Sequence, residues 1–325
     1  MPRSPLILIA TAIAIVIPAF GAAAQDYPSR PIRAITTTSA GGISDIFMRA
    51  LGEGLRQRLG QPIVVENRPG GMQMVGARVC QDSAPDGYTI CIINADSMIY
   101  NQFLFKSLPF DPMHGLQPVT KLFDLIHMLV VNSDLKVKNV DELVALSKAK
   151  PGTLSYLTPG APMVLYMETL KKARGADWVR VPFKGGGDAV NSMLTGTAQI
   201  AIFGIGNLLP FIRDGKIIGL AVDGDTRSPL APDIPTFKEL GYKEHISAIF
   251  FGMFAPAGTP KPIIDKLNKA IVAIESKAEF QQKYLINRGL TAVLKSPEEF
   301  AEELKTDRAE GLAVVKASGL YPGVK

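Results

Sequence analysis

The chain has 325 residues, of which 47% are hydrophobic and 20% are charged, an ordinary composition for a folded globular protein that is long enough for two domains. Its formal net charge is +5, and the basic residues are scattered rather than gathered in one run. The charge therefore argues against a nucleic-acid partner and mildly favours an anionic ligand.

The N-terminus has the pattern of an export signal. Arg3 precedes an apolar run from Leu6 to Phe20, and the small residues Gly21–Ala24 follow it. This pattern predicts a signal peptide over residues 1–24, with cleavage after Ala24. The alternative is a retained membrane anchor, but the apolar run is short for a bilayer span.

Strand-like and helix-like segments alternate from Ile32 onward. Strands at 32–36, 63–66 and 89–94, separated by helices at 45–59 and 73–82, predict a parallel sheet covered by helices. An irregular stretch at 106–118 follows. The alternation then continues with strands at 128–131, 154–157, 179–182, 200–203, 217–222 and 249–255, and with helices at 139–149, 164–173, 189–195, 208–214, 262–276 and 297–318.

Three of these strands lead into loops rich in Gly, Pro, Ser or Thr. The loops lie at Ser39–Asp45, Thr158–Pro162 and Gly185–Asp188. Ligands of open parallel sheets bind beyond the carboxyl ends of the strands, so the three loops are expected to face one crevice. In the first loop two glycines allow close approach, Ser44 or Asp45 would cap the next helix, and its free amides would attract a carboxylate or phosphate. The alternative is that each loop is only a tight turn.

The two cysteines, Cys80 and Cys91, are predicted near a helix end and in the following strand. An oxidising compartment would permit a disulfide between them, and the alternative is a pair of buried thiols. Their spacing does not fit a C-x-x-C redox or zinc motif.

An enzyme is the main alternative from another class. The chain has no G-x-S-x-G nucleophile elbow, and its three histidines, His114, His127 and His245, lack metalloprotease spacing. Gly204 and Gly206 begin a dinucleotide-like pattern that has no third glycine. We therefore expect no catalytic residues, no metal and no cofactor, and a secreted hydrolase remains the less favoured interpretation.

Seven short blocks make the sequence recognisable from Tyr27 to the C-terminus. They are Tyr27–Ile32, Gly41–Asp45, Glu66–Gly70, Pro85–Thr89, Lys150–Gly152, Val181–Gly186 and Phe254–Pro260. In this order and spacing the chain resembles the Bug, or TctC-like, family of periplasmic solute-binding proteins from tripartite tricarboxylate transport systems.

The resemblance implies an α/β protein with the two-lobed type 2 periplasmic binding-protein fold, in which mixed, mainly parallel sheets are flanked by helices. Lobe one would combine residues 25–126 with 247–325, and lobe two would span 127–246. The implied protein is a periplasmic monomer that closes around a small carboxylate and delivers it to the membrane permease subunits of a tripartite transporter. An alternative output is a membrane sensor kinase.

The resemblance also transfers a ligand site residue by residue. Lobe one would contribute Ser39, Ala40, Gly41, Gly42 and Ser44, and lobe two Thr158, Pro159, Gly160 and Ala161, with Gly185, Gly186 and Gly187 in a second loop. The lobe-two loop departs from the family pattern, because Ala161-Pro162 replaces a Gly-Ser continuation and the loop is about two residues shorter. Pro162 has no amide to donate.

Two acids near these loops are candidate selectivity residues. Asp96 follows the strand at 89–94 within Asn94-Ala95-Asp96-Ser97, and Asp188 follows the triple glycine. An acid in a carboxylate pocket repels the ligand unless it is paired, so Asn94, Asp96, Ser97 and Asp188 complete the candidate site. One hypothesis is that Asp96 or Asp188 receives a ligand amino group or proton, and the alternative is that each caps a helix.

Overall fold

The structure is a computed structural model that describes residues 27–158, 160–181, 186–224, 226–242 and 249–320. The predicted signal peptide, Pro159 and Gly185 lie outside these residues. Within them, no helix has both the length and the apolar character that a membrane crossing requires.

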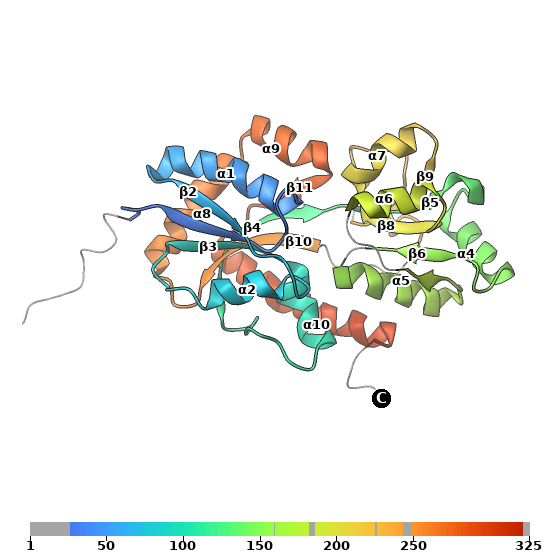
Figure 1. Ribbon diagram of the computed structural model, residues 1–325, viewed down its shortest axis with the longest axis horizontal. Coiled ribbons are helices and arrows are strands. Elements are labelled where there is room, and N and C mark those ends of the chain that lie inside the picture. The colour runs from blue at the N-terminus through green and yellow to red at the C-terminus, as the bar shows by residue number, and fades with distance from the viewer. Residues whose placement is uncertain (1–26, 159, 182–185, 225, 243–248, 321–325) are drawn as a thin grey trace, which may run out of the picture.

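Two separate sheets form the centres of two lobes that lie side by side (Figure 1). The first sheet has the strand order β11-β4-β10-β3-β1-β2. Its strands are β1 (Ile32–Thr36), β2 (Ile63–Asn67), β3 (Thr89–Asn94), β4 (Leu116–Leu125), β10 (Ile249–Pro256) and β11 (Leu290–Ala292). Strand β1 pairs in parallel with β2 and β3, whereas β10 is antiparallel to β3 and β4, and β11 is antiparallel to β4. The sheet is therefore mixed.

Helices cover both faces of the first sheet. One face carries α1 (Ile43–Leu59), α8 (Lys261–Glu275) and α9 (Ala278–Tyr284), and the other carries α2 (Met74–Gln81), the π-helical turn η1 (Asp96–Tyr100), α3 (Asn101–Leu104) and α10 (Pro297–Ser318). Successive strand residues point to opposite faces, so Ile90 and Ile92 pack with Phe47 of α1 while Ile93 packs with Phe300 of α10.

The second sheet has the order β7-β6-β8-β5-β9. Its strands are β5 (His127–Asn132), β6 (Ser155–Leu157), β7 (Val179–Arg180), β8 (Ile200–Gly204) and β9 (Ile217–Val222). Helices α4 (Val140–Ala149) and α5 (Gly160–Arg174) cover one face, and α6 (Gly186–Leu194) and α7 (Ile205–Arg213) cover the other. Strand β6 is parallel to β7 and β8, and β5 is antiparallel to β8 and β9.

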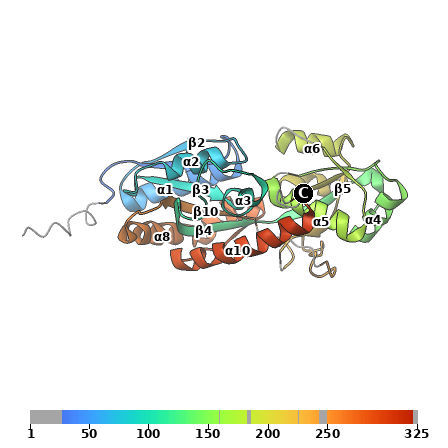
Figure 2. The same cartoon turned by 90° about the horizontal axis from the view of Figure 1, so that it is seen from below.

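The chain passes between the lobes twice, and a helix bridges them. It leaves the first sheet after Leu125, enters the second at His127, and returns to the first sheet in β10. Helix α10 runs from the first lobe to beneath α5, as both views show (Figure 2), and Lys172 Nζ of α5 donates to the Ala317 carbonyl at 3.2 Å. Ala161 and Leu165 of α5 join the apolar cluster of the first lobe.

The structure decides between the two interpretations of the cysteines. Cys80 of α2 and Cys91 of β3 form a disulfide, and both are fully buried. The bond fastens α2 to the sheet beside Ile35 of β1, the register partner of Cys91.

Several boundaries differ from the sequence pattern. Strand β4 begins at Leu116, inside a segment expected to be irregular, and η1 and α3 follow β3 where no helix was expected. Helix α5 begins at Gly160 rather than at Val164, so Ala161 and Pro162 belong to its first turn. Proline is tolerated there because the first-turn amides have no partner within the helix.

Candidate functional site

The loop between β1 and α1 is held by its own backbone. Gly42 is the N-cap of α1 and makes no side-chain capping bond, so the expectation that Ser44 or Asp45 occupies the cap position is wrong. The Gly42 amide donates to the Ser39 carbonyl at 3.0 Å, and the Gly41 amide donates to Asp45 Oδ2 at 2.9 Å. Asp45 thus closes the loop from within the first helical turn.

A polar cluster beneath the loop fixes the Asp45 carboxylate. Asn67 Nδ2, at the end of β2, lies 3.0 Å from Asp45 Oδ1, and an Arg49 guanidinium nitrogen lies 2.9 Å from the same oxygen. Burial by itself would raise the pKa of this carboxyl, but the hydrogen bonds from Arg49, the Gly41 amide and Asn67 lower it below its usual range. Asp45 is therefore ionised and compensated at neutral pH.

Hydroxyl groups complete the rigid base of the loop. Thr38 Oγ1 and Ser44 Oγ are 2.6 Å apart, and Thr37 Oγ1 donates to Gln73 Oε1 at 2.9 Å. A Cβ on Gly42 would come within 2.8 Å of Thr38 Oγ1 and 2.9 Å of the Ser39 carbonyl, so only glycine fits this turn without a shift. Ser39, Ala40 and Gly41 are exposed above this base.

The first turn of α1 has open hydrogen-bond donors. In the described part of the chain, nothing accepts a hydrogen bond from the amides of Ile43, Ser44 or Asp45, although Ser44 and Asp45 are 0% and 3% exposed. Unsatisfied amides at a helix start attract anions, and buried ones are costly unless a ligand or water takes them. These amides, which come from the backbone alone, are the candidate anion seat of the first loop.

After β3, a buried side-chain carboxylate accepts a hydrogen bond from a backbone amide of the second lobe. Asp96 is 4% exposed, and its Oδ2 accepts from Asn94 Nδ2 at 2.6 Å while its Oδ1 accepts from the Ala161 amide at 2.8 Å. Burial raises the pKa of the Asp96 carboxyl, although these two hydrogen bonds and the nearby His127 act in the opposite direction. Ser97 is fully buried, and its Oγ has no hydrogen-bond partner among the described residues.

His127 stands at the crossing between the lobes. Its Nδ1 lies 3.1 Å from Asp223 Oδ2, and its amide donates to Asp223 Oδ1 at 2.8 Å. His127 is 3% exposed and the Asp223 side chain is 12% exposed, so the pair is largely buried where the chain enters the second sheet. The sequence pattern gave no reason to join His127 with Asp223, because 95 residues of the second lobe separate them.

The structure brings some of the expected site residues together. Asn94, Asp96, Gly160 and Ala161 form one contact between the lobes, and a Cβ on Gly160 would lie 3.0 Å from Asp96 Oδ1. Thr158 is buried at the end of β6. Gly186, Gly187 and Asp188 begin α6, and Pro159 and Gly185 lie outside the described residues. Among described residues, no hydrogen bond joins the Ser39–Ser44 loop to α5.

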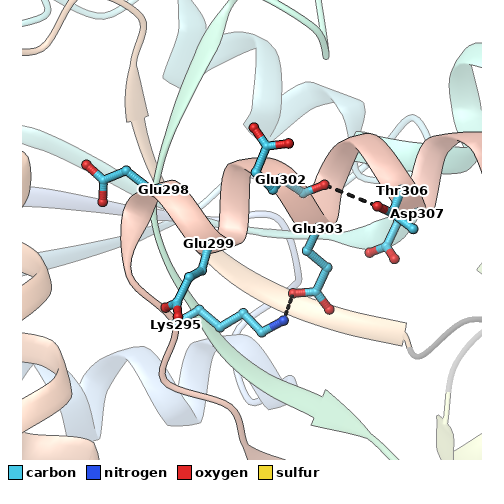
Figure 3. A pocket seen from close by; sticks show the side chains of 7 residues that line it. All are labelled: Lys295, Glu298, Glu299, Glu302, Glu303, Thr306 and Asp307. Carbon is cyan, nitrogen blue, oxygen red and sulfur yellow. Dashed lines mark hydrogen bonds and ion pairs between the residues drawn. The ribbon is translucent and has the colours of Figure 1, made fainter.

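A pocket on the first lobe lies apart from these loops. It is lined by Lys295, Glu298, Glu299, Glu302, Glu303, Thr306 and Asp307 from α10 and the segment before it (Figure 3). Lys295 Nζ pairs with Glu303 at 2.8 Å (Figure 3). The buried Lys121 pairs with Glu303 and with Asp124, each at 2.8 Å. These pairs fasten α10 to β4, and this is a structural role. Across the described ranges, no group of three or more His, Cys, Asp or Glu side chains has the arrangement of a metal site.

Comparison with known proteins decides the family. Residues 47–320 match the family described as "Tripartite tricarboxylate transporter family receptor". The chain belongs to this family. Its members are periplasmic binding proteins and not enzymes, so the hydrolase alternative is excluded.

Relatives and solved structures align with almost the whole of this chain. Protein BugT of Bordetella pertussis is 33% identical over 91% of this chain and 91% of its own length. An R. palustris protein solved with adipate has 26% identity and a TM-score of 0.82, covering 90% of this chain and 99% of that one. MatC from Rhodopseudomonas palustris, with bound malate, has 25% identity and a TM-score of 0.78, covering 89% and 100%. The two-lobed fold is therefore that of periplasmic binding proteins.

Proposed function

We propose that this protein captures a small carboxylate between its lobes and delivers it, without chemistry, to the membrane subunits of a tripartite tricarboxylate-type transporter. The observation that carries the proposal is the row of open amides at Ile43, Ser44 and Asp45, at the carboxyl edge of the first sheet. Support comes from family membership and from the adipate and malate bound to two structures of the same fold.

The proposed ligand surface comes from both lobes. The seat, made of the amides of Ile43, Ser44 and Asp45, is flanked by the first-loop residues Ser39, Ala40, Gly41, Gly42 and Ser44. The surrounding wall would be formed by Asn94, Asp96, Ser97, Thr158, Pro159, Gly160, Ala161, Gly185, Gly186, Gly187 and Asp188. Closure of the lobes would remove water from the seat and strengthen its hydrogen bonds, because the local dielectric falls. The mobile units in this proposal are residues 25–126 with 247–325, and residues 127–246, in a monomer exported to the periplasm.

The test is calorimetric titration of the purified protein with a panel of small carboxylates, preceded by a thermal-shift screen, since a ligand of the native state raises the melting temperature. The variant Gly42→Ala should weaken carboxylate binding at least about tenfold, because its Cβ displaces Thr38 or Ser39 and rotates the open amides.

Gly54→Ala is the matched control. It lies in the same helix, and its Cβ would come within 2.9 Å of Ile274 on α8, far along the helix from the seat. It should lower stability and leave affinity unchanged. Equal carboxylate affinity in folded Gly42→Ala and wild type would exclude the seat.

A further inference from the structure

Helices α1 and α5 each begin after the carboxyl end of a strand, and the two helix starts differ in the number of amides still available to an anion. Helix α5 has 15 residues, and its first three positions are Gly160, Ala161 and Pro162. Pro162 has no N–H, and the Ala161 amide already donates to Asp96 Oδ1 at 2.8 Å. Of the three first-turn positions, only Gly160 therefore keeps an amide for a ligand.

The Asp96 carboxylate is built into this position. Asn94 holds its other oxygen at 2.6 Å, and the residue is 4% exposed. Gly160 has a φ of +69°, and any Cβ there would lie 3.0 and 3.3 Å from the two Asp96 oxygens. The carboxylate thus packs directly against the first-turn backbone of α5, where a ligand's anionic group would otherwise sit.

Helix α1 shows the opposite arrangement. The carboxylate of Asp45 accepts a hydrogen bond from the Gly41 amide and pairs with Arg49. The amides of Ile43, Ser44 and Asp45 therefore have no acceptor among the described residues. One helix start is therefore open to an anion, and the other is filled by a side chain of the opposite lobe.

We propose that Asp96 is the specificity-determining residue of this protein: it takes the place of a second ligand carboxylate, so the ligand is a monocarboxylate. This inference rests on the proposed carboxylate-binding function. A dicarboxylate long enough to reach α5 would bring its second charge beside the Asp96 carboxylate, which Asn94 and the Ala161 amide hold in place. His127 lies close enough to act on Asp96, but its Nδ1 already lies 3.1 Å from Asp223 Oδ2, so part of the repulsion between the two carboxylates remains. Like charges about 4 Å apart weaken binding by about a hundredfold or more.

The experiment compares acids that differ only in the second carboxylate. Wild-type protein is titrated calorimetrically with butyrate and succinate, hexanoate and adipate, and benzoate and terephthalate. We expect the monocarboxylate to bind at least about tenfold more tightly in every pair that binds.

Two variants of Asp96 separate charge from contact. Asp96→Asn keeps an acceptor for the Ala161 amide and removes the charge, so it should reduce the preference at least about tenfold. Asp96→Ala also frees the amide and should favour the dicarboxylate further. Asp265→Asn, an acid of the first lobe that pairs with Lys261 on the surface of α8, is the control and should change nothing.

The outcomes distinguish this inference from the function on which it rests. A wild-type protein that binds the dicarboxylates as tightly as their partners, or an unchanged preference in folded Asp96→Asn, overturns the inference and supports carboxylate capture. If no acid of either kind binds to wild type or variants, carboxylate capture itself is wrong, and the inference falls with it.

Discussion

Reduction of the disulfide between Cys80 and Cys91 should lower the stability of the first lobe by about 3 kcal/mol. The two residues are 11 apart in sequence, so the bond closes a short loop in the unfolded chain. The loop-entropy relation for a closed loop of about a dozen residues gives roughly 3 kcal/mol at 25 °C. Cys80 and Cys91 are fully buried between α2 and β3, so the disulfide is shielded from solvent in the folded protein.

The assay is urea unfolding with and without dithiothreitol, followed by far-ultraviolet circular dichroism and by the fluorescence of Trp178, the single tryptophan, which lies in the second lobe. The dichroism transition should lose about 3 kcal/mol on reduction. The double variant Cys80→Ala/Cys91→Ala should have the lower unfolding free energy in both conditions, and dithiothreitol should not change it. Two titratable thiols in the untreated, denatured protein would refute the bond, and equal unfolding free energies before and after reduction would refute the entropy argument.

Two further predictions concern single residues of the first lobe. Burial, together with the charge of Glu303, raises the pKa of Asp307 to about 7 (Figure 3), so unfolding releases a proton between about pH 4 and 7 and stability falls as pH rises through that window. A shift of about three pKa units corresponds to about 4 kcal/mol, and partial exposure of Asp307 to solvent reduces this to about 2 kcal/mol. Asp307→Asn should therefore match wild type near pH 4 and exceed its stability by about 2 kcal/mol at pH 8 in urea titrations, and parallel pH profiles would contradict this. Met72 has a φ of +52° and is 43% exposed, so Met72→Gly should raise the unfolding free energy by about 0.5–1 kcal/mol, whereas Val75→Gly within α2 should lower it by about 1 kcal/mol. A loss in both variants would show that the left-handed turn is not strained.

Local patterns predicted much of the fold because each element carries its own periodicity. Strand β3 is a run of apolar residues buried on both faces, and α8 has apolar residues at helical spacing. Strand β4 was not predicted because Pro118 and Lys121 interrupt its run of apolar residues. Lys121 can be buried because it pairs with Asp124 and with the distant Glu303. A pairing across more than 180 residues of sequence has no local signal.

The candidate site divides in the same way. The glycines of the first loop were recognisable because close backbone approach requires them, and Gly42 indeed has no room for a Cβ. The supports of the loop were not recognisable. Asp45 bonds to Gly41 instead of capping α1, and Asn67 reaches it from the next strand, so each contact depends on where β2 lies beside β1.

The sequence by itself determined the alternation of strands and helices, the glycine loop after β1, and the family, because these depend on residue types at short spacing. Only the tertiary structure decided that Cys80 and Cys91 are bonded, and that Asp96 of one lobe meets Ala161 of the other. The physical reason is distance along the chain: Asp96 and Ala161 are 65 positions apart, and only the packing of α5 against the first lobe brings carboxylate and amide within hydrogen-bond reach.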